Sequence, residues 1–276
     1  MNDQVMTVLV LIGAVTLVSQ WLAWRLKLPA ILFLLVGGVL MGPTTGLLNP
    51  DELFGDLLFP FVSLSVALIL FEGSLTLKRS EIAGHGAVVR NLVTVGPLIT
   101  WSIVAAITHL AIGAAWPIAI LFGAIMTVTG PTVITPMLKA VRPTQNVANV
   151  LRWEGILIDP VGAILAVLAF NFIIAQQAAS AFDDALLLLF KLLASGFLLG
   201  ATAGYLWGTA LRRYWIPQAL QSVATLLIVL VVFLAAENIE HESGLLAVTV
   251  MGVFLANMRG VHVDEILDFK ERLSIL

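Results

Sequence analysis

The chain has 276 residues, of which 60% are hydrophobic and 11% are charged. Soluble domains average about 45–50% apolar and about 25% charged residues, so this composition excludes an ordinary soluble protein and predicts an integral membrane protein. The net charge of -3 is too small to indicate a nucleic-acid partner, and the absence of cysteine excludes disulfides and thiolate chemistry.

Nine apolar segments separated by short polar turns are predicted to be transmembrane helices. Each span needs about 20 apolar residues, and the segments are continuous rather than alternating, which argues against a β-barrel. The predicted limits are 4–24, 29–42, 57–77, 87–110, 115–138, 150–174, 184–210, 218–236 and 244–258. The sequence therefore predicts an all-α polytopic membrane helical bundle, with one transmembrane domain over residues 1–258.

The second of these segments, residues 29–42, is short and rich in glycine. Glycine is a poor helix former, and Pro43 follows the segment directly. We therefore expect an irregular helix at this point.

Charge alternates between the loops that connect the nine segments. The loops after the first, third, fifth and seventh segments and the chain after the ninth are basic, and the other loops are acidic or uncharged. The positive-inside rule then predicts an N-terminus outside and residue 276 in the cytoplasm of a cell whose plasma membrane holds the protein. Because no Lys or Arg precedes Arg25, the first segment lacks the basic region of a cleaved signal peptide and is expected to stay in the mature protein.

The seventh segment carries glycine at every fourth position. Small residues at this spacing form a smooth stripe that lets another backbone approach closely in lipid. We interpret the stripe as a packing surface, either for a neighbouring helix or for a second subunit. Its members are Gly196, Gly200, Gly204 and Gly208.

The last residues, 259–276, mix charged and apolar side chains at helical spacing. This pattern predicts an amphipathic helix. We expect a cytoplasmic linker that leads toward further spans.

The fifth segment, 115–138, is expected to contain a broken helix at Thr129, Gly130, Pro131 and Thr132. Proline removes a backbone donor and glycine disfavours helix. Non-helical backbone within a bilayer is tolerated where it is buried in protein or lines a water-filled cavity, and many secondary transporters build ion sites from such breaks. A proline kink healed by threonine hydroxyls is the alternative.

The sixth segment brings two carboxylates, Glu154 and Asp159, into the bilayer. A charge at the bilayer centre costs at least ~2.5–3.5 kcal/mol, so an acid there indicates function. Asp159 lies deeper in the apolar run and is interpreted as the group that binds a cation or a proton but not both, with Thr129, Glu154, backbone carbonyls and water completing the shell of a metal cation. Glu154 follows Arg152, so a salt bridge that orients the helix is the alternative to direct ligation by Glu154.

A third acid, Glu72, lies near the cytoplasmic end of the segment 57–77. A carboxylate at a helix end can reach the membrane interface, so we expect Glu72 to line an entrance or to have a structural role. The four histidines lie at segment ends or in loops, where side chains are usually solvated rather than catalytic.

At these positions the sequence resembles the monovalent cation:proton antiporter superfamily, in particular its NhaP-like sodium/proton branch. The most specific match is Glu154-Gly155-Ile156-Leu157-Ile158-Asp159, which falls on the family's Glu-Ser-x-x-Asn-Asp motif. The resemblance implies an NhaA-like antiporter fold with an unwound helix, in which Asp159 is the ion- and proton-binding aspartate, Glu154 its acidic companion and Thr129 a ligand from the unwound helix. Further matches are Leu28-Pro29-Ala30 through Gly42-Pro43, Phe71-Glu72-Gly73 and Ser243-Gly244-Leu245-Leu246-Ala247.

Three positions depart from the family pattern. Gly130 stands in place of the Asp of Thr-Asp-Pro, Gly155 in place of a Ser that often ligates the ion, and Ile158 in place of Asn or Asp. Because Ile158 carries no charge, the resemblance favours electroneutral exchange of one cation for one proton. The family also has further spans in a second inverted repeat, which is incomplete here, so we expect the chain to be the front part of a longer antiporter or to obtain the missing half from another chain.

The favoured function is secondary active antiport of a monovalent cation, with Na+ ahead of K+ or Li+, against protons by alternating access, serving pH homeostasis. We expect no enzymatic activity and no cofactor beyond the transported ions, and the resemblance implies a homodimer. The alternatives are a gated cation channel or K+-efflux protein, and a non-transporting fragment. An intramembrane aspartyl protease is disfavoured because it needs two cooperating aspartates and only Asp159 lies deep in a span.

Overall fold

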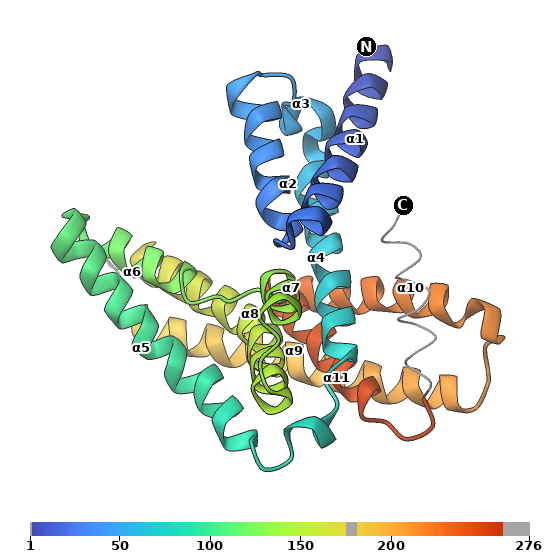
Figure 1. The fold of residues 1–276 in the computed structure, drawn as a ribbon. Coiled ribbons are helices and arrows are strands. Elements are labelled where there is room, and N and C mark those ends of the chain that lie inside the picture. Colours follow the sequence, from blue (N-terminus) through green and yellow to red (C-terminus); the bar gives the residue numbers. More distant parts are fainter. Residues whose placement is uncertain (1, 175–180, 262–276) are drawn as a thin grey trace. The chain divides into compact units, whose positions relative to one another are not determined.

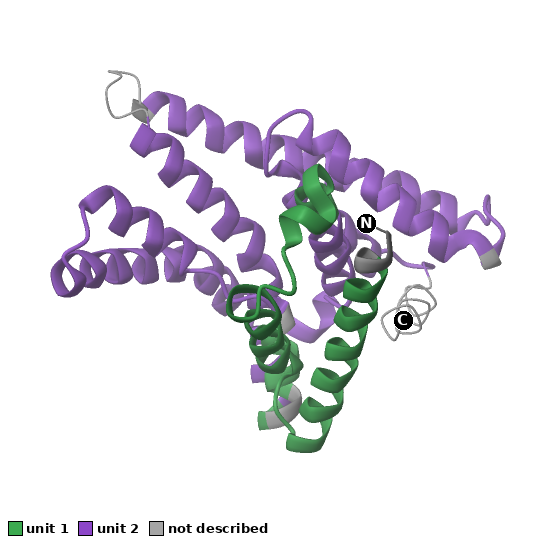
Figure 2. Cartoon of the chain, turned by 90° about the horizontal axis from the view of Figure 1, so that it is seen from above, with its two compact units in different colours: residues 1–63, 132–144 green, residues 64–131, 145–276 purple. Residues whose placement is uncertain are grey.

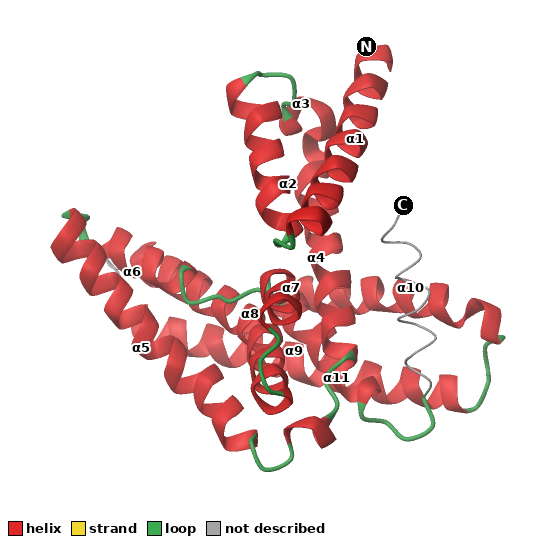
Figure 3. Ribbon diagram, viewed as in Figure 1, coloured by secondary structure: helices red, strands yellow, loops and turns green. Residues whose placement is uncertain are grey.

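The computed structural model describes residues 2–174 and 181–261, and every regular element in these ranges is a helix (Figures 1 and 3). The predicted all-α fold is confirmed. Most of the predicted linker, residues 262–276, lies outside the described residues. The elements in chain order are α1 (Asn2–Leu26), α2 (Ala30–Val39), η1 (Leu40–Thr44), α3 (Pro50–Phe54), η2 (Gly55–Leu57), α4 (Leu58–Leu75), η3 (Arg79–Ile82), α5 (Gly86–Ile112), α6 (Trp116–Ile125), α7 (Pro131–Val141), α8 (Gln145–Ile174), α9 (Ala181–Arg212), α10 (Gln218–Glu237) and α11 (Ser243–Ala256).

Six stretches of helix within the described residues are long and apolar enough to cross a membrane. They make the chain a multi-pass membrane protein. Each of the nine predicted segments overlaps one helix or one pair of helices, but α6, α11 and the pair formed by α2 and η1 are shorter. That these three also cross the bilayer stays a prediction. The six long stretches are Met6–Leu26, Pro50–Leu75, Gly86–Ile112, Gln145–Ile174, Asp183–Arg212 and Leu220–Glu237.

The irregularity expected in the second segment takes the form of a π-helical turn. Helix α2 ends at Val39, and η1 continues the chain with Pro43 inside it. The hydroxyl of Thr44 donates to the carbonyl oxygen of Leu40 at 2.7 Å, and so does the hydroxyl of Thr45, at the same distance. The hydroxyl of Thr44 also lies 3.1 Å from the carbonyl oxygen of Val39, which the missing N–H of Pro43 leaves without its α-helical donor.

The chain divides into two compact units, drawn in different colours in Figure 2. The first comprises residues 1–63 and 132–144, and in it α1 packs on α2 where Gly37 leaves room for the side chain of Val15. The second comprises residues 64–131 and 145–276 and holds the two clusters of buried apolar side chains. Thr129, Gly130, Pro131, Glu154 and Asp159 belong to the second unit, whereas Thr132 belongs to the first.

Helix α11 runs through the main core of the second unit beside α9 (Figure 1). The glycine stripe of α9 faces it along its whole length. A Cβ atom at Gly196 would lie 2.9 Å from Cβ of Leu246, and one at Gly204 would lie 3.0 Å from Cβ of Phe254. Gly200 and Gly208 meet the carbonyl oxygen of Ala247 and the sulfur of Met258 even more closely. The partner of the stripe is therefore a helix of the same chain, which decides between the two alternatives that the spacing left open.

Two further helices approach α11 through its own glycines. At Gly252 a Cβ would meet Ser74 of α4 and lie 2.7 Å from the carbonyl oxygen of Phe71, and at Gly244 it would lie 2.6 Å from the ring of Phe233 on α10. Such close backbone approach maximises the dispersion contacts that hold helices together in lipid. Helix α11 is thus enclosed by α4, α9 and α10.

Helices α5, α6 and α8 form a second group of packed helices in the same unit. Gly123 of α6 lies so close to α5 that a Cβ would be 2.8 Å from the carbonyl oxygen of Trp101. The indole nitrogen of Trp101 donates to the carbonyl oxygen of Ile120 at 2.7 Å, which satisfies its polar edge inside an apolar contact. This group supplies both sides of the candidate site.

Candidate functional site

The predicted helix break is present in the structure. Helix α6 ends at Ile125, residues 126–130 are not helical, and α7 begins at Pro131. A proline is well suited to the first position of a helix, where its missing N–H would have no intrahelical partner. The hydroxyl of Thr127, a buried residue, donates to the carbonyl oxygen of Ala124 at 2.6 Å and so closes the end of α6. Residues 128–130 cross the break with non-helical backbone.

Thr129 and Glu154 meet across this break. The hydroxyl of Thr129 donates to Oε1 of Glu154 at 2.6 Å, within the short range expected for a hydrogen bond to a charged acceptor. The two residues are 25 positions apart and come from different elements. The break and the acidic helix α8 are therefore in contact through Thr129 and Glu154. The roles of these two residues in ion binding stay a prediction.

Gly162 of α8 makes the close approach of the break possible. A Cβ atom at this position would run into the side chain of Val128 and lie 3.6 Å from the hydroxyl of Thr127. Helical geometry places Asp159 about 60° to one side of the direction of Gly162, and Glu154 about 80° to the other side. Both carboxylates therefore flank the face of α8 on which the unwound segment lies.

Asp159 is half-buried within α8, and its side chain has no hydrogen bond or ion pair with any residue that the structure describes. Pro160 follows it inside the helix and cannot donate a backbone hydrogen bond, so the carbonyl of Ile156 lacks its usual partner within α8. A carboxylate without a partner, a released carbonyl and the hydroxyl of Thr129 are the oxygen ligands that a hard monovalent cation prefers. Among the described residues, no group of three or more His, Cys, Asp or Glu side chains gathers to bind a metal, so a cation at this site would need hydroxyl, carbonyl or water oxygens as well.

Arg152 does not pair with Glu154. Its Nη1 atom lies 3.6 Å from Oε2 of Glu81, in η3, and the hydrogen-bond partner of Glu154 is Thr129. The alternative in which a salt bridge with Arg152 explains Glu154 is therefore wrong. Glu81 was missed in the sequence, although an acid two positions after Arg79 in a basic loop was a signal that it has a cationic partner.

The remaining predicted positions surround this centre less directly. Glu72 is half-buried on α4. At the next residue, Gly73, an added Cβ atom would lie 3.4 Å from the side chain of Ile156 on α8. A structural or entrance-lining role for Glu72 stays a prediction. Gly130 is the last non-helical residue of the break, and Thr132 lies in the first turn of α7, although its side chain is outside the described part of the structure.

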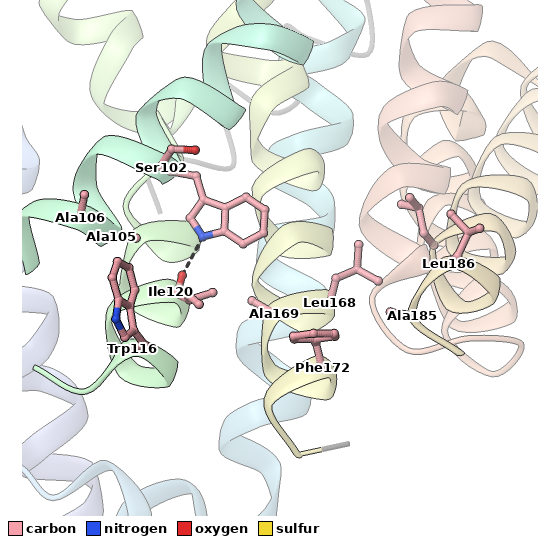
Figure 4. A pocket seen from close by; sticks show the side chains of 12 residues that line it. Ser102, Ala105, Ala106, Trp116, Ile120, Leu168, Ala169, Phe172, Ala185 and Leu186 are labelled. Carbon is pink, nitrogen blue, oxygen red and sulfur yellow. Dashed lines mark hydrogen bonds between the residues drawn. The ribbon is translucent and has the colours of Figure 1, made fainter. Parts of the chain in front are cut away.

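A cavity among α5, α6, α8 and α9 is not the ion site. It has a volume of about 620 Å³, no charged side chain lines it, and its walls include Trp116, Leu168 and Phe172 (Figure 4). The indole nitrogen of Trp101 donates to the carbonyl oxygen of Ile120, the dashed line in Figure 4, and the hydroxyl of Ser102 donates to the carbonyl oxygen of Leu98 at 2.7 Å. An indole N–H such as that of Trp116 is a donor and cannot bind a cation. A desolvated cation would find no ligand here.

Comparisons with known proteins agree with this architecture. Residues 12–272 match the family described as sodium/hydrogen exchanger, transmembrane. The K(+)/H(+) antiporter NhaP2 of Shewanella sp. (strain ANA-3) is 27% identical over 259 residues, which cover 91% of this chain and 44% of that protein. The Na(+)/H(+) antiporter 1 of Methanocaldococcus jannaschii is 26% identical over 267 residues, which cover 92% of this chain and 61% of that protein. The chain thus spans about half the length of the curated relatives it matches.

A solved structure shares the fold. The sodium proton antiporter MjNhaP1 from Methanocaldococcus jannaschii at pH 8 superimposes with a TM-score of 0.80 and 23% identity, covering 99% of this chain and 68% of the other. The antiporter fold expected from the resemblance is therefore confirmed. Because the family match extends over nearly the whole sequence, the chain belongs to the transmembrane sodium/hydrogen exchanger family.

Proposed function

We propose that the chain forms the ion-binding part of an antiporter that exchanges a monovalent cation for protons by alternating access. The observation that carries the proposal is the hydrogen bond between Thr129 and Glu154, which brings the unwound segment onto the face of α8 that also presents Asp159. Relatives named as K(+)/H(+) and Na(+)/H(+) antiporters support the substrate class, with Na+ as our first choice and K+ or Li+ as the others.

Asp159 is the shared site in this mechanism. Its carboxylate binds a cation when ionised, and a proton that neutralises it removes the charge that attracted the cation. The hydroxyl oxygen of Thr129 can coordinate a cation while its hydrogen still points to Oε1 of Glu154. The hydrogen bond therefore orients the hydroxyl and leaves its oxygen lone pairs available. Opening this centre to each side of the membrane in turn exchanges the two ions.

Electroneutral exchange is proposed because α8 offers one unpaired carboxylate at this point. Ile158, the neighbour of Asp159, is 1% exposed and belongs to the packed interior of the unit. A second charge at position 158 would have to be desolvated there without a partner. One cation per proton is the ratio that this chain can support.

The setting is proposed to be the plasma membrane of the cell, with the N-terminus outside and the basic loops in the cytoplasm. A homodimer and the absence of a cofactor beyond the transported ions are proposed from the resemblance. Because the glycine stripe of α9 is covered by α11 within one chain, a dimer would have to use another surface.

Transport by the whole protein in proteoliposomes tests the proposal. An imposed pH gradient should drive a cation against its own gradient, and Asp159→Asn, which preserves size but cannot ionise, should abolish this flux. Asp183→Asn, which changes an exposed acid near the start of α9, is the matched control and should leave the flux intact. Flux that only follows the cation gradient would indicate a channel, and retained flux in Asp159→Asn would refute the role of this residue.

A further inference from the structure

A second cavity in the same unit has the opposite character to the apolar one. It has a volume of about 390 Å³ and lies between η3, the first turns of α5 and the middle of α8. Arg79 and Arg90 line it together with Trp153 and the apolar side chains Val89, Val93 and Leu157. The cavity therefore joins a basic rim to a hydrocarbon wall.

Neither arginine of the rim forms a salt bridge within the described residues. The acid closest in sequence to Arg79, Glu81, pairs with Arg152 instead. Thr94, also at the cavity, uses its hydroxyl to donate to the carbonyl oxygen of Arg90 at 2.8 Å. Two positive charges thus remain at the cavity without a compensating negative group among the residues that the structure describes.

The other groups at the cavity also favour a negatively charged ligand. Gly86 begins α5 at the cavity, the first turn of this long helix contains no acid, and His85 provides no side-chain cap. The positive end of the helix dipole is therefore uncompensated. Trp153 is 6% exposed, and its indole N–H has no hydrogen-bond partner among the described residues, which is costly for a buried donor.

Hydrogen bonds hold the rim in place before any ligand binds. The backbone N–H of Arg79 donates to Oδ1 of Asn257 at 2.7 Å, and Nδ2 of Asn257 donates to the carbonyl oxygen of Leu77 at 2.8 Å. At the other end of η3, Nδ2 of Asn149 donates to the carbonyl oxygen of Glu81 at 3.1 Å. The loop that carries Arg79 is thus fixed to both α8 and α11.

We propose that this cavity binds an anionic phospholipid, with its phosphate between Arg79 and Arg90 and the beginning of an acyl chain against Val93 and Leu157. The chemistry recognised at the rim is a phosphate, and the apolar wall distinguishes a lipid from a free anion. A basic recess at the end of membrane helices attracts such headgroups. The inner leaflet follows from the orientation proposed above, but lipid binding itself does not depend on the transport activity.

Native mass spectrometry of the whole protein tests this site. Detergent-purified protein is incubated with phosphatidylglycerol or phosphatidylcholine, and the retained lipid is counted. Phosphatidylglycerol should be retained preferentially, and Arg79→Gln/Arg90→Gln should weaken its binding roughly 25-fold, about fivefold for each charge lost near the membrane surface. Arg212→Gln/Arg213→Gln, at the basic end of α9, is the matched control and should bind like the unsubstituted protein.

Three further arms keep the test decisive. Arg79→Lys/Arg90→Lys keeps both charges and should keep most of the binding, which guards against a folding artefact. Val93→Trp fills the apolar wall without changing charge and should also lower lipid retention, and excess inorganic phosphate should leave the lipid bound. Equal retention of the two lipids, equal losses in the two Gln variants, or displacement by inorganic phosphate would overturn the proposal, the last in favour of a free-anion site.

Discussion

In two interfaces of the second unit, glycine allows close approach of the backbone, but the side chains that meet there differ in polarity. Between α9 and α11, four glycines bring two helices together over apolar side chains. Between α8 and the unwound segment, Gly162 also permits close approach, but the surfaces that meet carry Thr129, Glu154 and Asp159. The first interface is a scaffold, whereas the second holds side-chain oxygens that we propose as ion ligands. Substitutions in the two interfaces should therefore fail differently.

The largest expected effect is loss of folding from the scaffold side. Gly200→Leu would force a side chain into the carbonyl oxygen of Ala247 and Cβ of Val250, and overpacking of this kind costs about 1–3 kcal/mol or more. We expect little monodisperse protein on size-exclusion chromatography. Gly13→Leu, at a position with nothing within 4 Å, is the matched control and should behave like the unsubstituted protein. Normal yield of Gly200→Leu would mean that α9 and α11 are not packed as described.

Gly162→Leu should damage transport more than folding. The added side chain would displace Val128 and with it the unwound segment, so Thr129 would move away from Glu154. We expect exchange to fall by more than tenfold while the melting temperature changes little, since misplacement of reacting groups by about 1 Å can cost about 100-fold in rate. Gly96→Leu, on α5, serves as the control, because an added Cβ there would lie at an unstrained 3.6 Å from the carbonyl oxygen of Asn91. Unchanged exchange in Gly162→Leu would argue against the close approach of the break.

Thr129→Val should separate the hydroxyl from the shape of the side chain. Valine fills the same volume but cannot donate to Glu154 or offer an oxygen to a cation, and a hydrogen bond to a charged group contributes about 1.5–3 kcal/mol. The cation concentration for half-maximal exchange should rise by about tenfold or more. Thr129→Ser keeps the hydroxyl and should stay close to the unsubstituted protein. If both variants behaved alike, the hydroxyl would have no part in the site.

The smallest effect concerns Glu242, in the loop before α11. Burial, and then the carboxylate of Glu237, raise the pKa of Glu242, while His241 opposes the shift. The carboxyl group of Glu242 thus holds its proton more tightly in the folded protein than in the unfolded chain. Ionisation of Glu242 therefore lowers the stability of the fold as the pH rises from about 4.5, the ordinary pKa of the group, through its raised pKa in the folded protein. Glu242→Gln should therefore raise the melting temperature more at pH 7 than at pH 4. A difference that is the same at both pH values would contradict the assignment.

The comparison of the two interfaces also shows what the sequence could reveal. The break was predictable because Gly130 and Pro131 act on their own backbone, and the acids were predictable because a charge in an apolar span is costly wherever it points. The glycine spacing identified a packing face of α9 but not its partner, because periodicity describes only one side of a contact.

Long-range pairing was the part that sequence could not supply. Arg152 is close to Glu154 in the chain, yet its partner is Glu81, which η3, between α4 and α5, brings to the first turns of α8. The role of Gly162 was equally hidden, because its meaning depends on Val128, a residue of another element. Both contacts arise only when the tertiary fold is formed.

The central claim is that Asp159 holds either a cation or a proton. Calorimetric titration of the whole protein with Na+ in buffers of different ionisation enthalpy measures the protons released as the cation binds. About one proton should be released per cation at a pH where Asp159 is protonated, and Asp159→Asn should show neither cation binding nor proton release. Cation binding without proton release, or release that persists in Asp159→Asn, would contradict it.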